Sequence, residues 1–163
     1  MTARPKLTLE RIFHASPDEV WDLWTTRDGM EAWMGPEGFN VTINELDLRP
    51  GGELVYAMTA VGPDQVEYMT KAGMPLVNVQ NVRFVELVPP RRLVTRETAD
   101  FIEGVESYDV ETVVELEEVA EGTRVVLTFD SMHDAHWTEM SRLGRESELR
   151  KLEELLASRK RPT

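Results

Sequence analysis

The 163 residues include 30 acidic and 18 basic side chains, which give a formal net charge of −12 at pH 7. A charge of this sign repels a phosphate backbone, so we expect no nucleic-acid partner. The chain has no cysteine, which excludes disulfides, thiolate metal sites and cysteine nucleophiles. Its length and its 41% hydrophobic content predict one globular domain over residues 1–163.

Apolar runs in the sequence are all short. None approaches the roughly 20 residues that a membrane span needs. The first residues also lack the apolar stretch of a secretion signal. We therefore expect a cytoplasmic protein with no membrane span.

The first predicted element is a strand over residues 7–14, where large side chains alternate on both faces. Ser16-Pro17-Asp18-Glu19 then has the form of a capping box with proline at the first helical position. This predicts a helix that begins there. A second short helical turn over residues 28–33 should end at Gly35-Pro36.

Short extended segments follow, and they are typical of an antiparallel meander. Turn residues such as Pro89-Pro90 and Glu121-Gly122 separate most of them. The predicted strands are 39–48, 52–60, 77–88, 92–99, 107–118 and 123–130. The connection over residues 61–77 carries more apolar side chains than a solvated loop requires, so we expect it to fold over the structure as a lid.

Charge is unevenly distributed near the end of the chain. Residues 97–121 hold ten acidic residues and no Lys or Arg. We expect a solvated hairpin that protects a sheet edge, with a docking surface for a basic partner as the alternative.

A final helix should run from a cap at Asp134 to about Ala157. Its Glu148 and Lys151 have the spacing of a helical ion pair. The element order β-α-α-β6-α predicts an α+β fold in which a curved antiparallel sheet wraps around this helix. Side chains either fill the space between the two or leave a pocket there.

Several ordered motifs carry a family resemblance. They are Arg11-Ile12-Phe13-His14-Ala15-Ser16-Pro17, Trp33-Met34-Gly35-Pro36, Asp47-Leu48-Arg49-Pro50-Gly51-Gly52 and Val85-Glu86-Leu87-Val88-Pro89-Pro90. Together they resemble the homologues of the activator of the heat-shock-protein-ninety ATPase, within the START-like helix-grip (SRPBCC) superfamily. The resemblance implies a helix-grip fold with an internal apolar cavity. It does not fix a function, since members range from cochaperone domains through lipid carriers to cyclases.

Aromatic rings and thioethers are the side chains expected around such a cavity. Aromatic rings offer large apolar faces, and thioethers adapt to irregular gaps. The candidate ligand-binding residues are Trp24, Trp33, Tyr56, Met58, Met69, Met74, Tyr108, Trp137 and Met140. The alternative is that these side chains only fill the core.

Other site chemistry has weaker support in the sequence. One metal-like cluster consists of Asp130, His133, Asp134 and His136. Because a helix cap is a simpler role for Asp134, we expect no metal and no cofactor. The serines lack a nucleophile-elbow pattern, so we name no catalytic residue.

A cavity acid or base could still come from charged strand residues that turn inward. The candidates are Glu45, Arg83, Arg96 and Glu111. Surface placement or a cross-strand ion pair is the expectation, although a single bulge reverses the facing.

Taken together, the residues favour non-catalytic binding of a small hydrophobic molecule, such as a lipid, between the sheet and the last helix. The first alternative, which the resemblance implies, is a cochaperone-like module of the stress response that stimulates a chaperone ATPase. The second is a cyclase- or hydratase-like enzyme that uses the cavity. Both a monomer and a homodimer are compatible with an exposed sheet edge.

Overall fold

A computed structural model describes residues 4–100 and 103–159. Its strands are β1 (Lys6–Phe13), β2 (Phe39–Leu46), β3 (Glu53–Ala60), β4 (Val77–Val88), β5 (Arg92–Ala99), β6 (Tyr108–Val119) and β7 (Gly122–Asp130). They form one antiparallel sheet in the order β1-β7-β6-β5-β4-β3-β2. The helices are α1 (Pro17–Thr25), α2 (Arg27–Trp33), α3 (Pro63–Lys71) and α4 (Ala135–Arg159).

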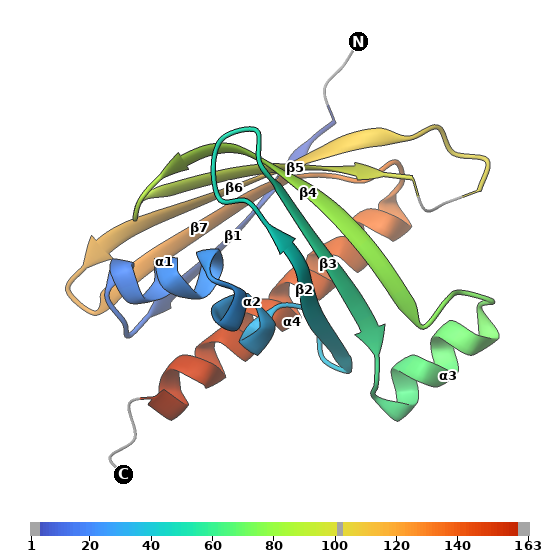
Figure 1. Ribbon diagram of the computed structural model, residues 1–163, viewed down its shortest axis with the longest axis horizontal. Coiled ribbons are helices and arrows are strands. Elements are labelled where there is room, and N and C mark those ends of the chain that lie inside the picture. The colour runs from blue at the N-terminus through green and yellow to red at the C-terminus, as the bar shows by residue number, and fades with distance from the viewer. Residues whose placement is uncertain (1–3, 101–102, 160–163) are drawn as a thin grey trace.

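The sheet curves strongly around α4, which crosses its concave face, while α1 and α2 close one end (Figure 1). This arrangement confirms the predicted α+β helix-grip fold, and strands β2 to β7 form the predicted antiparallel meander. The prediction of a single domain covers residues 1–163, and part of that range lies outside the described residues. No helix in the described part of the chain is long and apolar enough to cross a membrane.

The caps predicted at the start of the chain are present. The Ser16 hydroxyl accepts a hydrogen bond from the Glu19 N–H at 3.2 Å, and Pro17 is the first residue of α1. Trp33 Nε1 donates to the Leu23 carbonyl at 2.7 Å, which ties α2 to α1. The second bond fixes the Trp33 ring at the junction of α1 and α2.

Helix α4 buries only one part of its length in the core. Asp134 Oδ1 accepts from the Trp137 N–H at 2.8 Å, so the predicted cap is confirmed. Leu149, Leu152 and Leu156 are each at most 3% exposed, whereas Met140 is 39% exposed. The N-terminal half of α4 therefore packs less closely against the sheet than the C-terminal half does.

The segment over residues 61–77 differs from the expected loop because it contains α3. Pro63 occupies the first turn, where its missing N–H costs no hydrogen bond. Met69 is 6% exposed, and it is the buried apolar side chain of α3. The helix was missed because the sequence offers no side-chain cap, and Gly62 at the N-cap makes no side-chain hydrogen bond.

Candidate ligand cavity

A cavity of about 340 Å³ lies between the concave face of the sheet and the N-terminal half of α4. We call it the main cavity. Trp24 and Trp33 line one end, with ring centroids 4.5 Å apart in an edge-to-face arrangement. Leu54, Val82, Phe84, Leu93, Val114 and Leu127 of the sheet provide most of the remaining apolar wall. The volume is within the range of small-molecule pockets.

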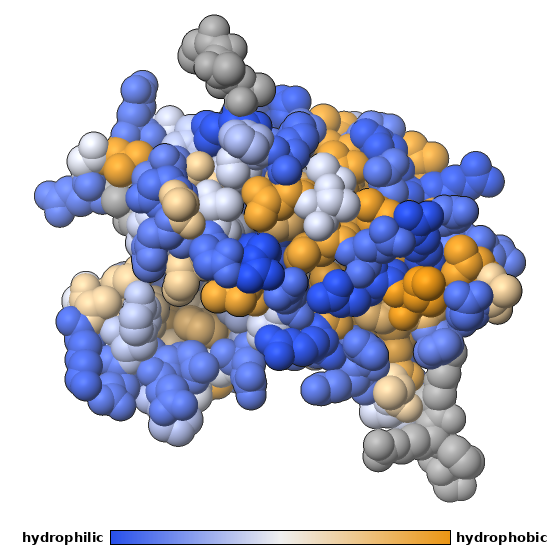
Figure 2. Space-filling view, turned by 180° about the vertical axis from the view of Figure 1, so that it is seen from behind, coloured by the Kyte–Doolittle hydropathy of each residue, from blue (hydrophilic) through white to orange (hydrophobic). Residues whose placement is uncertain are grey.

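A second cavity of about 280 Å³, the lid cavity, lies beside the first. Met69 and Met74 of the 61–77 segment line it together with Phe39 of β2. Five residues line both cavities, which therefore adjoin: Met58, Gln80, Glu97, Ser141 and Arg145. Viewed from the opposite side of the molecule, Figure 2 shows an apolar recess beside the lobe formed by α3.

The most unusual polar group in this wall is the Glu97 carboxylate. Glu97 faces inward because its cross-strand neighbours, Val82 and Val110, are both buried on the concave face. Burial raises the pKa of Glu97, and the positive charge of Arg145 opposes this rise. Glu97 was expected in the solvated acidic hairpin, and the structure corrects that expectation for this residue.

Three further polar side chains surround the open space. Arg145 Nη2 donates to Thr112 Oγ1 at 3.0 Å, and its guanidinium lies 4.2 Å from the Phe129 ring centroid. Glu148 Oε2 accepts from the Gly35 N–H at 2.7 Å, and burial raises the pKa of this carboxyl. Burial also raises the pKa of Tyr56 well above 10, so its hydroxyl stays protonated at neutral pH.

The bond from Glu148 to Gly35 replaces the ion pair that its spacing with Lys151 predicts. Lys151 Nζ instead donates to the Gly35 carbonyl at 2.8 Å. Both side chains thus fasten α4 to the residues that follow α2. Helical spacing cannot reveal such a contact, since Gly35 is more than a hundred residues away in the chain.

Seven of the nine candidate ligand-binding residues line one cavity or both: Trp24, Trp33, Tyr56, Met58, Met69, Met74 and Met140. Tyr108 and Trp137 line neither, which corrects their predicted position. The Tyr108 hydroxyl lies 2.7 Å from His133 Nδ1 and accepts from the His133 N–H at 3.1 Å. Trp137 packs against the His136 ring, with centroids 5.3 Å apart.

The four residues of the metal-like cluster have other partners. His133 forms a hydrogen bond with Tyr108, Asp134 caps α4, Asp130 pairs with Lys6 at 2.6 Å, and the His136 ring packs against Trp137. In residues 4–100 and 103–159, no group of three or more His, Asp or Glu side chains is placed to hold a metal ion.

The strand charges considered as inward acids or bases lie on the outer face. Arg96 Nε donates to Glu111 at 3.0 Å across β5 and β6, which is the expected cross-strand ion pair. Glu45 and Arg83 are exposed. The cavity carboxylate and guanidinium are instead Glu97 and Arg145, which the sequence analysis did not select.

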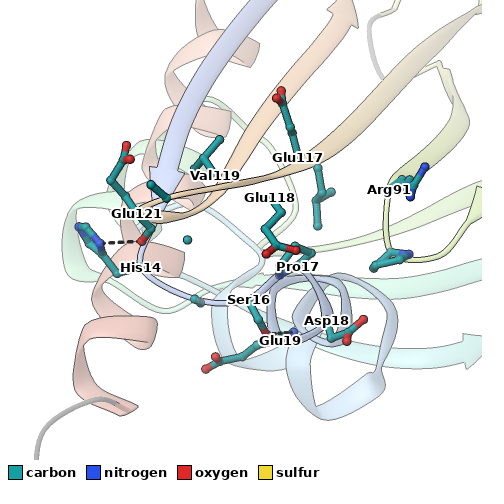
Figure 3. A pocket seen from close by; sticks show the side chains of 15 residues that line it. His14, Ser16, Pro17, Asp18, Glu19, Arg91, Glu117, Glu118, Val119 and Glu121 are labelled. Carbon is teal, nitrogen blue, oxygen red and sulfur yellow. Dashed lines mark hydrogen bonds between the residues drawn. The ribbon is translucent and has the colours of Figure 1, made fainter.

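A larger hollow of about 860 Å³ lies on the outside, between the start of α1 and the β6–β7 turn (Figure 3). Its charged side chains include Asp18, Glu117, Glu118 and Glu121, all of which are exposed. His14 Nδ1 lies 3.1 Å from the Glu121 carbonyl oxygen at its edge. This acidic and solvated surface does not suit an apolar ligand, and the main cavity remains the candidate site.

Comparison with protein families settles the relationship that the fold indicates. The model of the family described as "Activator of Hsp90 ATPase homolog 1-like protein" matches residues 14–157. The chain belongs to this family. A comparison with curated proteins finds no match.

Solved structures similar to this member of the family show the same fold. A Chromobacterium violaceum protein is 24% identical, with a TM-score of 0.76 over 93% of this chain and 96% of that one. The AHSA1 protein of Silicibacter pomeroyi is 20% identical, with a TM-score of 0.74 over 95% and 99%. An Arthrobacter aurescens protein is 20% identical, with a TM-score of 0.73 over 94% and 86%. At these identities the likeness concerns the fold alone.

Proposed function

We propose that this protein binds a small, largely apolar molecule in the main cavity without transforming it. The observation that carries the proposal is the 340 Å³ space walled by apolar side chains of both the sheet and α4. Removing apolar ligand surface from water contributes about 25 cal/mol per Å². A few polar groups in the wall would set the orientation of the ligand.

The 61–77 segment would act as the lid of this site. Met69 and Met74 of the segment line the lid cavity, which shares five wall residues with the main cavity. Thioether side chains repack at low cost around ligands of different shape. Movement of α3 would therefore change access to the adjoining space while the sheet stays fixed.

Binding is favoured over a cyclase- or hydratase-like reaction because neither carboxyl of the cavity wall has a proton-relay partner among the described residues: Glu148 accepts from the Gly35 backbone N–H, and Glu97 has no hydrogen bond. No histidine lines the main cavity, and no described side chain lies within hydrogen-bond distance of Glu97 to relay a proton. General acid–base catalysis needs such a positioned partner or a substrate that supplies one. Turnover of an added unsaturated ligand would decide for the enzyme.

Native mass spectrometry of the freshly purified protein tests the proposal. We expect a retained small molecule, with a mass that is lost when the protein is unfolded and refolded. The refolded protein should then bind 1-decanol with a shift in tryptophan emission, since Trp24 and Trp33 line the cavity. Absence of both a retained molecule and any emission shift would refute the proposal.

Membership of the family favours a second candidate function, namely stimulation of a chaperone ATPase. The acidic hollow of Figure 3 is the surface that would suit a basic partner. An ATPase assay with the chaperone of the same organism tests this function. An unchanged rate at saturating protein would refute it.

A further inference from the structure

The Glu97 carboxylate faces the cavity without a partner. Among residues 4–100 and 103–159, no side chain or backbone N–H forms a hydrogen bond with it, and no cation lies within 4.0 Å, so the charge of Arg145 acts on it from farther away. Glu97 keeps some accessible surface because open space lies beside it, but protein surrounds it otherwise. A carboxylate in such surroundings is costly unless a donor reaches it, so its position between both cavities indicates a bound donor.

The two other charged groups of the wall each have a partner in the protein. The Arg145 guanidinium is fixed by its hydrogen bond to Thr112 and by its stacking on Phe129. One Glu148 oxygen accepts the Gly35 N–H. Glu97 is therefore the charged acceptor of this wall whose hydrogen-bonding capacity is left to a ligand.

The charge of the wall also favours a cation. The wall contains two carboxylates, Glu97 and Glu148. The charges of Arg145 and Lys151 both act on Glu148, whereas Arg145 is the cation that acts on Glu97, so Glu97 has less compensating positive charge. A bound carboxylate would approach both acids, whereas an ammonium group would neutralise one of them. The net charge of −12 adds an attraction of the same sign at longer range.

We propose that the ligand of the main cavity carries a protonated amine, whose ammonium group donates to Glu97 while its apolar part lies among the aromatic side chains. This inference rests on the proposed function and adds the chemical class of the ligand. The Tyr56 hydroxyl lines the same cavity and provides a neutral donor or acceptor beside the amine. Tyr56, Trp24 and Trp33 offer ring faces that attract a cation.

Three ligands with the same alkyl chain separate the head group from the apolar part: decylamine, 1-decanol and decanoate. Their affinities for the full chain are measured at pH 7.5 by calorimetry and by tryptophan emission. We expect decylamine to bind at least about tenfold more tightly than decanoate, since charge-assisted hydrogen bonds are among the strong ones. Decanoate binding as tightly as decylamine, or more tightly, would overturn the inference.

The variant Glu97→Gln removes the charge and keeps the shape of the side chain. We expect about a tenfold loss of decylamine affinity and a change in 1-decanol affinity below about twofold. Glu45→Gln is the matched control, because it removes one exposed carboxylate from the same sheet and changes the net charge equally. Unchanged decylamine affinity in Glu97→Gln, or an equal loss in Glu45→Gln, would overturn the inference.

The outcomes distinguish this inference from the proposed function. If 1-decanol binds but decylamine has no advantage over decanoate, the cavity binds apolar molecules and the amine assignment is wrong. If none of the three ligands binds, the proposed function fails, and the amine assignment fails with it. The comparison of the three head groups uses the natural sequence, so it holds even if Glu97→Gln folds poorly.

Discussion

Filling the main cavity from α4 should abolish binding while it stabilises the protein. Gly144 lines this cavity, and a Cβ added there would have no atom within 4 Å outside its own helix. Replacing a mid-helix glycine by leucine gains about 1 kcal/mol from helix propensity. A buried leucine side chain contributes up to about 1.5–3 kcal/mol more. For a chain of this length, each kcal/mol raises Tm by about 2–4 °C.

The matched control is Gly144→Ala, which gains the helix propensity but adds only one carbon to the cavity. We expect Gly144→Ala to raise Tm by about 2–4 °C and to bind 1-decanol as the natural chain does. Gly144→Leu should raise Tm at least as much and bind 1-decanol at least about tenfold more weakly, because its side chain occupies the ligand space. Calorimetry and thermal unfolding measure both effects. Natural affinity in a stabilised Gly144→Leu would refute the reasoning, since the ligand would then lie elsewhere.

Three further predictions concern stability, and urea or thermal unfolding measures them. Leu152→Ala should cost about 2–5 kcal/mol, because this fully buried side chain holds α4 on the sheet; a loss below about 1 kcal/mol would contradict the packing. Ser16→Ala should cost about 1 kcal/mol through loss of the α1 cap, and an unchanged Tm would argue against that hydrogen bond. Burial raises the pKa of Glu97 and Glu148 above the ordinary 4.5, so the folded state binds protons more tightly than the unfolded state. The stability that these two groups contribute is present below pH 4.5 and is lost as the pH rises through their raised pKa values. In Glu97→Gln, the free energy of unfolding should therefore fall less steeply with rising pH.

Local signals in the sequence were sufficient for most of the fold. The Ser16 cap and the Asp134 cap are short-range hydrogen bonds whose spacing is visible in the chain. Strand alternation and turn residues predicted the positions of the meander strands, because the side chains on the concave face are mostly apolar. Helix α3 was missed, since its N-cap is Gly62 and its one buried side chain is Met69.

The residue types predicted most of the apolar wall of the candidate site, but they did not predict its charged groups, Glu97 and Arg145. Glu97 alternates in phase with Leu93 and Ala99, both buried, so strand periodicity could have placed it inward. Its place at the start of a run of acidic residues predicted a solvent-exposed side chain instead. Arg145 lies four residues before the buried Leu149, a helical spacing that puts the two on one face.

Tyr108 was misplaced for a different reason. It is an aromatic residue on a strand, as the cavity residue Tyr56 is, but its hydroxyl is hydrogen-bonded to His133, which precedes the last helix. Arg4 also lies over its ring, 4.2 Å from the centroid. These long-range polar contacts hold the ring away from the cavity, and residue type alone cannot reveal them.

A crystal structure of the protein with decylamine tests the central claim most directly. The account predicts an alkyl chain between Trp33 and Leu127 in the main cavity, with its nitrogen within about 3 Å of a Glu97 oxygen. An empty or side-chain-filled main cavity, with the amine bound on the outer surface or in the hollow of Figure 3, would contradict it.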